Sequence, residues 1–339
     1  MATSLETAKR VLMDAASFDF PNNVSRGSDM SGSTADTRTG HYIYPPLSPE
    51  QVERGRWLFL AELGDALSGS GFSAGAAEID AMVLLRRPVA RATCSAVLGS
   101  LDADSRNEVA DLVLAWIDAL APVIASRRSP GRWSRARRGE RRARLALDAR
   151  LGDVLPALGI EDTPQIVATL LAAGVQVPIA AGAWLLIFLA AHPDSDVDPD
   201  HAAWEALRVA PPTWATARIT TTAVELAGEQ VGAGEVVLVS PLLLGRLASL
   251  APDEPDDLTS FCPDRWARDD VRPGAWLPFG AGAHACPGRT LGLGLMRDLA
   301  TWAGRHELTL AASVTIDESR GILPAPARII VSPLDDIDR

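Results

Sequence analysis

The chain has 339 residues, of which 47% are hydrophobic and 22% charged, and its net charge is -11. This length supports a sizeable core, and the acidic balance argues against a nucleic-acid-binding protein. The cysteines, Cys94, Cys262 and Cys286, are too sparse and odd in number for a disulfide framework, so we expect a cytoplasmic protein. The N-terminus lacks a basic start followed by a long apolar run, so the sequence predicts no signal peptide.

The first half of the sequence predicts helices. Apolar spacing indicates helices over residues 7–13, 49–67, 76–98, 105–125 and 133–155, and polar residues over 22–39 indicate a loop. Ser48 followed by Gln51 is a capping-box pattern at the start of the second helix. Thr163 and Pro164 then start a long apolar helix, with threonine as the cap and proline in its first position.

The long helix contains a charge-free run from residue 166 to 192, which is long enough to span a bilayer. The central helix of a large globular domain has the same composition. Gln176 and Pro178 lie at the centre of the run, and the sequence has no second run of this kind. We therefore expect a buried helix and no membrane span.

Beyond Asp200 the pattern changes. A short helix over 204–209 ends before two prolines, and residues 213–226 and 235–243 alternate in the manner of strands. Irregular chain covers 251–278, a helix follows Cys286, and residues 322–331 predict a closing hairpin. The expected fold class is mainly α with minor β.

Basic residues are concentrated between residues 127 and 144. Such a run is either a solvated helix face with partners such as Glu140, or a contact surface for an acidic partner or ligand. The arginines concerned are Arg127, Arg128, Arg132, Arg135, Arg137, Arg138, Arg141, Arg142 and Arg144.

The loop from residue 279 to 288 has the features of a site for a flat ligand with a metal. Its glycines, Gly280, Gly282 and Gly288, allow positive φ and a close approach of the backbone. If Pro287 occupies the first helical position, Cys286 lies at a helix N-terminus, where free N–H groups and the dipole favour a thiolate. A thiolate binds haem iron and pushes electron density toward bound oxygen.

His284, two residues before the cysteine, can reach a carboxylate of such a ligand. A lone cysteine before a helix is otherwise most simply a buried free thiol. Because the whole pattern of the loop is present, we favour a ligand role for Cys286.

The loop resembles the signature of the cytochrome P-450 superfamily, F-x-x-G-x-x-x-C-x-G, at Phe279, Gly282, Cys286 and Gly288. Two further motifs stand upstream in the order found in the family. Glu205-Ala-Leu-Arg208 is similar to the E-x-x-R of helix K, and Phe261-Cys-Pro-Asp-Arg265 is similar to the stretch whose arginine completes a structural triad with it. Arg218 resembles the arginine that binds a haem propionate.

The resemblance implies one cytochrome P-450-like domain over residues 1–339. Residues 1–45 are similar to a shortened helix B and B–C region, 163–194 to helix I, and 204–334 to helix K, the haem-binding loop, helix L and the terminal hairpin. The first helix and first β-hairpin of the family have no counterpart, so we expect a fold that lacks them. The implied cofactor is haem b with Cys286 as iron ligand, and Arg38 and His41 are further propionate candidates.

Helix I departs from the family in its chemistry. Relatives carry Ala-Gly-x-Asp/Glu-Thr, whereas this chain has Ala173, Gly174, Gln176, Val177 and Pro178 at and after those positions. A glutamine cannot deliver a proton as a carboxylic acid does, and a valine cannot hydrogen-bond. Pro178 removes a backbone donor and would free the carbonyl of Gly174.

Three functions therefore stay open. The first is oxidative tailoring of a small organic molecule in bacterial specialised metabolism, by hydroxylation or oxidative cyclisation. That molecule can be bulky or carrier-bound, and a ferredoxin-type partner would supply electrons. The second is a non-monooxygenase haem enzyme that catalyses a peroxide-dependent or redox-neutral dehydration, rearrangement or cyclisation. The third is a catalytically silent relative that recruits partners, against which the retained cysteine loop argues.

Overall fold

The charge-free segment after Thr163 forms the central helix, α6 (Pro164–Ala191). The Thr163 side chain accepts a hydrogen bond from the N–H of Ile166, and Pro164 lies in the first turn, as the sequence predicts. The helix is long and apolar enough to cross a membrane, but 61% of its most apolar window is buried inside the protein. The computed structural model describes residues 1–20, 42–69, 75–126, 128, 130–193, 197–247, 257–267, 276–317 and 321–333.

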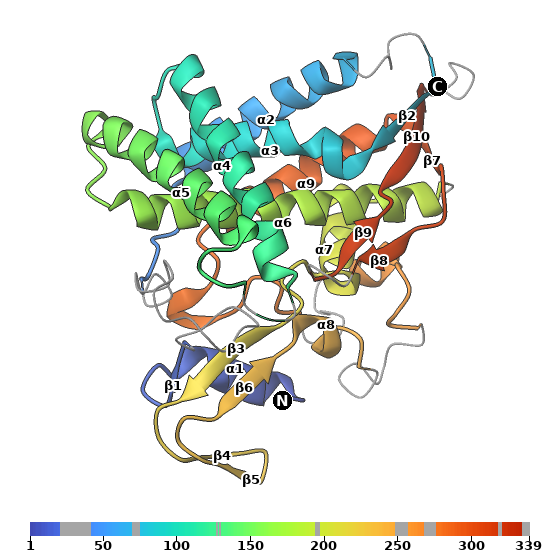
Figure 1. The fold of residues 1–339 in the computed structure, drawn as a ribbon. Coiled ribbons are helices and arrows are strands. Elements are labelled where there is room, and N and C mark those ends of the chain that lie inside the picture. Colours follow the sequence, from blue (N-terminus) through green and yellow to red (C-terminus); the bar gives the residue numbers. More distant parts are fainter. Residues whose placement is uncertain are drawn as a thin grey trace.

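A layer of helices surrounds α6 (Figure 1). The predicted capping box is present, because the Ser48 N–H donates to Gln51 Oε1 at 2.8 Å and the Gln51 N–H donates to Ser48 Oγ at 3.3 Å. Asp80, Asp102 and Ser134 cap three further helices. The helices of this layer are α2 (Pro49–Gly69), α3 (Ala81–Leu98), α4 (Ala103–Ile124), α5 (Arg135–Val154) and α9 (Arg289–Ala303).

Helices α3 and α6 approach closely at two glycines. A Cβ atom on Gly174 would lie 2.9 Å from Thr93 Cγ2, and one on Gly182 would lie 2.8 Å from Leu85 Cδ1. The two contacts are eight residues apart on each helix and run in opposite order, so the helices pack antiparallel. Glycine at both positions is what permits this separation.

One sheet lies at the edge of the helical layer. Its central strand, β10 (Arg328–Pro333), pairs antiparallel with β2 (Ala77–Asp80) and β7 (His306–Leu310). A separate pair consists of β8 (Thr315–Asp317) and β9 (Leu323–Ala325). The predicted hairpin over 322–331 is therefore wrong: β9 and β10 follow each other but pair with different strands, which lets β10 bury Ile329 and Val331.

The predicted helix over 76–98 is also wrong in its first residues, which form β2. Ile79 pairs with Ile329, so burial in the sheet prevails over helical spacing at this point.

A second sheet and a second apolar core form the lower part of the molecule in Figure 1. Strand β3 (Thr216–Thr220) lies between β1 (Phe18–Asp19) and β6 (Val236–Val239), and β4 (Val224–Leu226) pairs with β5 (Glu229–Val231). Helix α1 (Leu5–Met13) packs against β6 and against the cysteine loop. Residues 241–243, predicted as strand, belong to the short helix α8 (Pro241–Leu244), which Ser240 caps. The class, mainly α with minor β, is confirmed.

Candidate functional site

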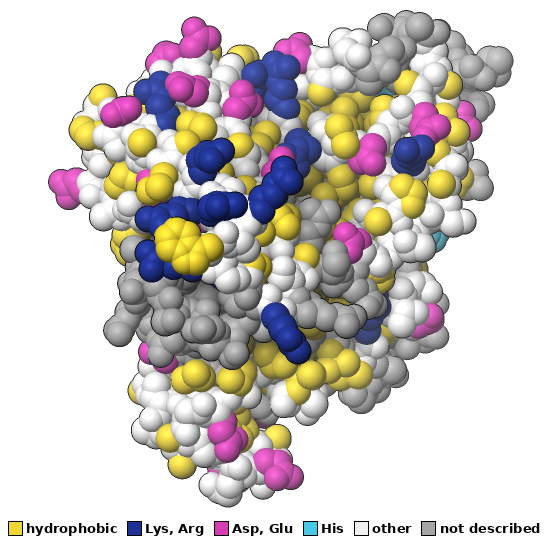
Figure 2. All heavy atoms as spheres, viewed as in Figure 1, with side chains coloured by type: hydrophobic (Ala, Val, Ile, Leu, Met, Phe, Trp, Pro, Cys, Tyr) yellow, Lys and Arg dark blue, Asp and Glu magenta, His cyan; other side chains and the backbone are white. Residues whose placement is uncertain are grey.

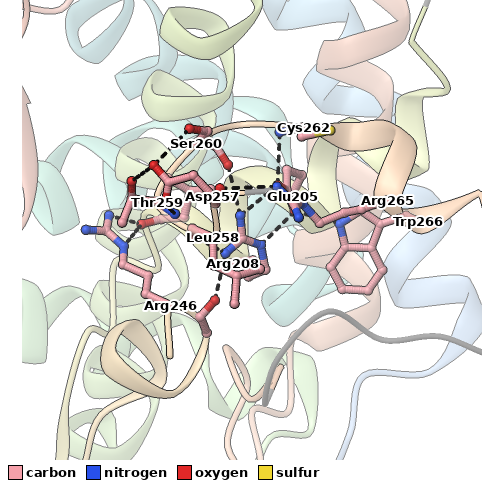
Figure 3. Close-up of polar contacts among 12 residues, drawn as sticks. Glu205, Arg208, Arg246, Asp257, Leu258, Thr259, Ser260, Cys262, Arg265 and Trp266 are labelled. Atoms are coloured by element: carbon pink, nitrogen blue, oxygen red, sulfur yellow. Dashed lines mark hydrogen bonds and ion pairs between the residues drawn. The ribbon is translucent and has the colours of Figure 1, made fainter. Parts of the chain in front are cut away.

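The structural triad predicted from the sequence is formed. Glu205 and Arg208 lie on α7 (Pro199–Val209), and Arg265 lies on the short 3-10 turn Pro263–Trp266. Arg208 donates to both carboxylate oxygens of Glu205, at 2.7 and 2.8 Å, and Arg265 Nε donates to Glu205 Oε1 at 2.9 Å. The three side chains point toward one another (Figure 3), and all are buried.

Neighbouring groups complete the hydrogen bonding of this triad. Trp266 Nε1 and the Cys262 N–H donate to Glu205 at 2.8 and 3.0 Å. Arg208 in turn donates to the carbonyls of Gly245, Leu258 and Ser260, at 2.6, 2.5 and 3.0 Å. A buried ion cluster is stable only when its remaining donors and acceptors are satisfied. This cluster thereby ties α7 to the irregular chain before the cysteine loop.

The cysteine loop is a turn stabilised by its own backbone. The Cys286 N–H donates to the Phe279 carbonyl at 2.9 Å, and Gly280 and Gly282 have φ values of 66° and 75°. A Cβ on Gly282 would lie 2.8 Å from the Leu12 carbonyl oxygen, because α1 packs against this turn. Positive φ is thus confirmed for Gly280 and Gly282, and Gly282 is also required by contact with α1. The expected positive φ at Gly288 is wrong, because that residue has a φ of -91° as the cap of the next helix.

Cys286 differs from the other two cysteines in its surroundings. Cys94 is fully buried in α3, and burial raises the pKa of its thiol to about 12. Partial desolvation also raises the pKa of Cys286, but a hydrogen bond from the Gly288 N–H and the charge of Arg289 act in the opposite direction. Cys286 is also the exposed residue among the three cysteines, so it is the one that an external ligand can reach.

The start of the following helix needs correction. We expect Pro287 in the first helical position, but α9 begins at Arg289 with Gly288 as its cap. The Gly288 N–H reaches the sulfur as expected, whereas the Arg289 N–H donates to the Cys286 carbonyl at 3.3 Å. The anion-stabilising effect at Cys286 therefore comes from one N–H group and a nearby charge.

Arg218 and His284 both contact the aromatic ring of Phe20. The Arg218 guanidinium carbon is 3.9 Å from the centroid of Phe20, and the His284 ring meets Phe20 edge-on with centroids 4.6 Å apart. Arg218 is buried, and no described carboxylate lies within ion-pair distance of it; it donates to Thr216 Oγ1 and to the Ala217 carbonyl. Desolvation lowers the pKa of Arg218, which favours an incoming anion as a partner.

The substituted positions of helix I lie in the middle of α6. Ala173 and Val177, one turn apart, are exposed in a helix whose C-terminal half is almost fully buried, and Gln176 and Pro178 are partly exposed. The Thr93 hydroxyl donates to the Gly174 carbonyl at 2.9 Å. The sequence indicates that this carbonyl loses its donor but not which residue replaces it. The one signal was a buried hydroxyl on a neighbouring helix.

These features fit the haem that the resemblance implies. The described residues supply an accessible thiol with an N–H group directed at its sulfur, a glycine turn that allows close approach, and a buried cation, Arg218, that feels the charge of Asp19 but has no described carboxylate within ion-pair distance. The thiol would bind the iron, the glycine turn would accommodate the flat macrocycle, and the cation would pair with an acidic side group. Arg38 and His41 lie outside the described residues.

The arginine-rich segment divides into two parts. Arg144 is buried, stacks over Trp116 at 4.3 Å and pairs with Asp148 at 2.8 Å. Glu140, expected as a partner of exposed arginines, is instead buried and accepts a hydrogen bond from Trp116. Basic side chains gather on the side of the molecule that carries α4 and α5 (Figure 2). Those exposed in the segment are Arg128, Arg132, Arg135, Arg138, Arg141 and Arg142.

Comparisons with known proteins agree with this geometry. The family model of cytochrome P450 matches residues 200–299, which contain the triad and the cysteine loop. The chain is 42% identical to cyclooctat-9-en-7-ol 5-monooxygenase of Streptomyces melanosporofaciens over 26% of this chain and 19% of that protein. It is 32% identical to cyclooctatin synthase of the same organism, over 43% of this chain and 39% of the relative.

The matches thus span well under half the length of these curated relatives. Among solved structures, the retinoic acid-bound cyanobacterial CYP120A1 has a similar fold, with a TM-score of 0.76 and 18% sequence identity, covering 98% of this chain and 88% of the other. The family implies a haem-iron cofactor. From the fold, the ordered motifs and the matched family model together, this chain belongs to the cytochrome P450 superfamily.

Proposed function

We propose that the protein is a haem-thiolate oxidoreductase that tailors a small organic molecule in bacterial specialised metabolism. The observation that carries the proposal is the contrast among the cysteines. Cys286 is exposed and receives an N–H group at its sulfur, while Cys94 is enclosed by apolar core. The names of the relatives, a monooxygenase and a synthase from Streptomyces, support the reaction class.

The residues of the proximal side would bind haem b. Cys286 would be the iron ligand, and Arg218 and His284 would neutralise the propionates, with Arg38 and His41 as further candidates. The loop residues Phe279, Gly280, Gly282 and Gly288 would allow the ring to approach the backbone. Bound there, the group would supply oxidative chemistry tuned by the electron-donating thiolate. Phe20, which contacts both Arg218 and His284, would be displaced on binding or would pack at the edge of the haem ring.

The distal side would bind an apolar ligand and supply no acid. Ala173 and Val177 present methyl groups to solvent, and Gln176 can donate hydrogen bonds without releasing a proton at neutral pH. Any proton needed in the reaction would therefore come from water or from a hydroxyl of the substrate. With a ferredoxin-type partner as electron donor, hydroxylation or oxidative cyclisation of an apolar substrate is compatible with this apolar distal surface.

The same observation supports a second candidate. A site without a proton-donating pair is compatible with a peroxide-dependent reaction, or with a redox-neutral dehydration, rearrangement or cyclisation of an apolar molecule. The two candidates share the cofactor and the substrate class and differ in the oxidant. A cytoplasmic location belongs to both, and the free cysteines support it.

The test begins with the cofactor. Purified wild type should contain about one haem per chain, and its reduced form should give a strongly red-shifted Soret band with carbon monoxide, which reports thiolate ligation. Cys286→Ser should abolish the band, and Cys262→Ser, the matched control on a partly buried cysteine, should keep it. A wild-type protein without haem would sink the proposal and favour a silent relative.

The oxidant is then decided by three parallel incubations with a panel of apolar cyclic hydrocarbons and alcohols. One contains NADPH, a ferredoxin reductase and a ferredoxin, the second hydrogen peroxide, and the third is anaerobic without reductant or peroxide. Product in the first alone supports the monooxygenase. Product in the second alone or in the third assigns the second candidate.

A further inference from the structure

The carbonyl of Gly174 lacks its helical partner. In an α-helix this oxygen accepts from the N–H of the residue four positions on, which is Pro178 and has no N–H. The Thr93 hydroxyl of α3 donates to it at 2.9 Å. Thr93 is only 3% exposed, so water has little access to the oxygen from that side. A carbonyl that is shielded from water and has no donor costs free energy, so the hydrogen bond from Thr93 to this part-buried carbonyl compensates for the missing N–H.

The contact depends on glycine as well as on the hydroxyl. A Cβ at position 174 would lie 2.9 Å from Thr93 Cγ2, which is shorter than side chains tolerate. Two turns along α6, Gly182 makes the same kind of close contact with Leu85. Thr93 is thus held in register opposite Gly174 by packing at both ends, and its hydroxyl has little freedom to seek another acceptor.

The helical turn that contains this carbonyl also carries the exposed apolar residues Ala173 and Val177. Ala173 precedes Gly174, and Val177 precedes Pro178, so both apolar side chains are attached to the turn whose ladder is interrupted. A proline inside a helix removes one hydrogen bond and can kink or break the helix. Helix α6 nevertheless continues past Pro178, from Pro164 to Ala191.

We propose that Thr93 is a positioning residue: its hydroxyl stands in for the absent N–H of Pro178 and holds Ala173 and Val177 in the orientation that forms the ligand-facing wall. The replacement of one donor by the other follows from the geometry alone. The assignment of that wall to a haem ligand rests on the proposed function.

The first experiment measures whether the two residues are coupled. Thr93→Val keeps the shape and removes the hydroxyl, Thr93→Ser keeps the hydroxyl, and Pro178→Ala restores the backbone N–H. Loss of a buried hydrogen bond should lower Tm by about 2–6 °C for Thr93→Val and by less for Thr93→Ser. In the Pro178→Ala background, Thr93→Val should lower Tm by less than half as much. Equal Tm losses in both backgrounds would overturn the coupling.

A matched control lies on the same helix. The Thr169 hydroxyl donates to the Gln165 carbonyl at 2.8 Å, but that carbonyl also has the backbone N–H of Thr169 available within α6. Thr169→Val should therefore change Tm little and show no coupling to Pro178→Ala. A loss as large as that of Thr93→Val would mean that any hydroxyl on this helix matters equally, which contradicts the proposal.

The second experiment reads position rather than stability, with carbon monoxide as the probe. The C–O stretching band of the reduced protein should shift or broaden in Thr93→Val, remain unchanged in Thr93→Ser, and return in Thr93→Val combined with Pro178→Ala. Coupled Tm values with an unchanged band would reduce Thr93 to a purely structural residue. A wild type that binds no haem would end the positioning role with the proposed function, while the Tm cycle would still decide the hydrogen-bond replacement.

Discussion

Arg208 donates two hydrogen bonds to the carboxylate of Glu205, at 2.7 and 2.8 Å, and neither side chain is exposed. Glu205→Gln keeps the volume but removes the negative charge that Glu205 supplies to Arg208 and Arg265 in the core. Removing one partner of a buried pair costs about 3–5 kcal/mol. We expect a loss of this size in the free energy of unfolding, measured by urea denaturation.

The matched control is a surface ion pair whose acid, Asp200, lies on the same helix as Glu205 and whose base lies on α9. Asp200 lies 3.6 Å from Arg297, and both side chains are well exposed. Asp200→Asn should change the free energy of unfolding by less than about 1 kcal/mol. If Glu205→Gln costs as little as this control, the cluster does not hold the chain before the cysteine loop in the way that its contacts indicate.

The sequence was sufficient for this cluster because two motifs, which precede the cysteine loop in the order found in the family, together carry its three charges. It was not sufficient for the groups that complete it. The carbonyls of Gly245 and Leu258 lie in segments without a motif, and their position depends on long-range packing. Thr93 was missed for the same reason, since its role depends on the register between α3 and α6.

The errors in secondary structure also arise from long-range contacts. Residues 77–80 have helical spacing, but they pair with a strand some 250 residues later in the chain, and the closing hairpin was wrong because β10 pairs with β2 and β7. Side-chain caps, by contrast, were predicted correctly: the capping box at Ser48 and the cap at Thr163 are both present. Boundaries set by a side chain within three residues could be predicted, and strand partners could not.

Substitution of Arg218 should weaken the binding of haem but have little effect on the stability of the haem-free protein. It is a buried cation without a described carboxylate partner, and its main aromatic contact is Phe20. Arg218→Met should therefore change the free energy of unfolding of the haem-free protein by no more than about 1 kcal/mol. If it binds a propionate, loss of haem to apomyoglobin should be roughly 30-fold faster, which corresponds to about 2 kcal/mol.

The control for Arg218 is an exposed arginine. Arg328 pairs with Glu78 at 3.2 Å on the outer face of its sheet, and Arg328→Met should leave the rate of haem loss unchanged. If haem-free Arg218→Met is strongly destabilised but loses haem at the wild-type rate, Arg218 has a structural role in β3 instead.

Gly55 should be intolerant of even one methyl group. A Cβ there would lie 2.9 Å from Leu291 Cδ1, 3.1 Å from Ala96 Cβ and 3.2 Å from the Ala92 carbonyl oxygen. The last two atoms belong to a neighbouring helix and cannot rotate away. Gly55→Ala should lower the free energy of unfolding by about 1–3 kcal/mol, although alanine is the better helix former.

The matched substitution is Gly139→Ala in α5, where a Cβ would meet nothing within 4 Å. Here only helix propensity acts, so the free energy of unfolding should rise by up to about 1 kcal/mol. The opposite signs of the two changes, measured in the same urea titration, test the packing of α2 against α3. A gain at Gly55 would show that this contact is looser than the distances indicate.

Because of Cys94, the free energy of unfolding of the haem-free protein should fall as the pH rises above 9. Burial raises the pKa of its thiol from 9.0 to about 12, so above pH 9 the unfolded chain loses this proton while the folded chain keeps it. The stabilisation is complete below pH 9 and is lost as pH rises toward 12, at about 1.4 kcal/mol per pH unit. Wild type should therefore lose more stability than Cys94→Ala between pH 9.5 and 10.5, in urea titrations under reducing conditions. Because other alkaline groups act equally on both proteins, parallel curves would mean that the Cys94 thiol ionises in the core as readily as in water, against its complete burial.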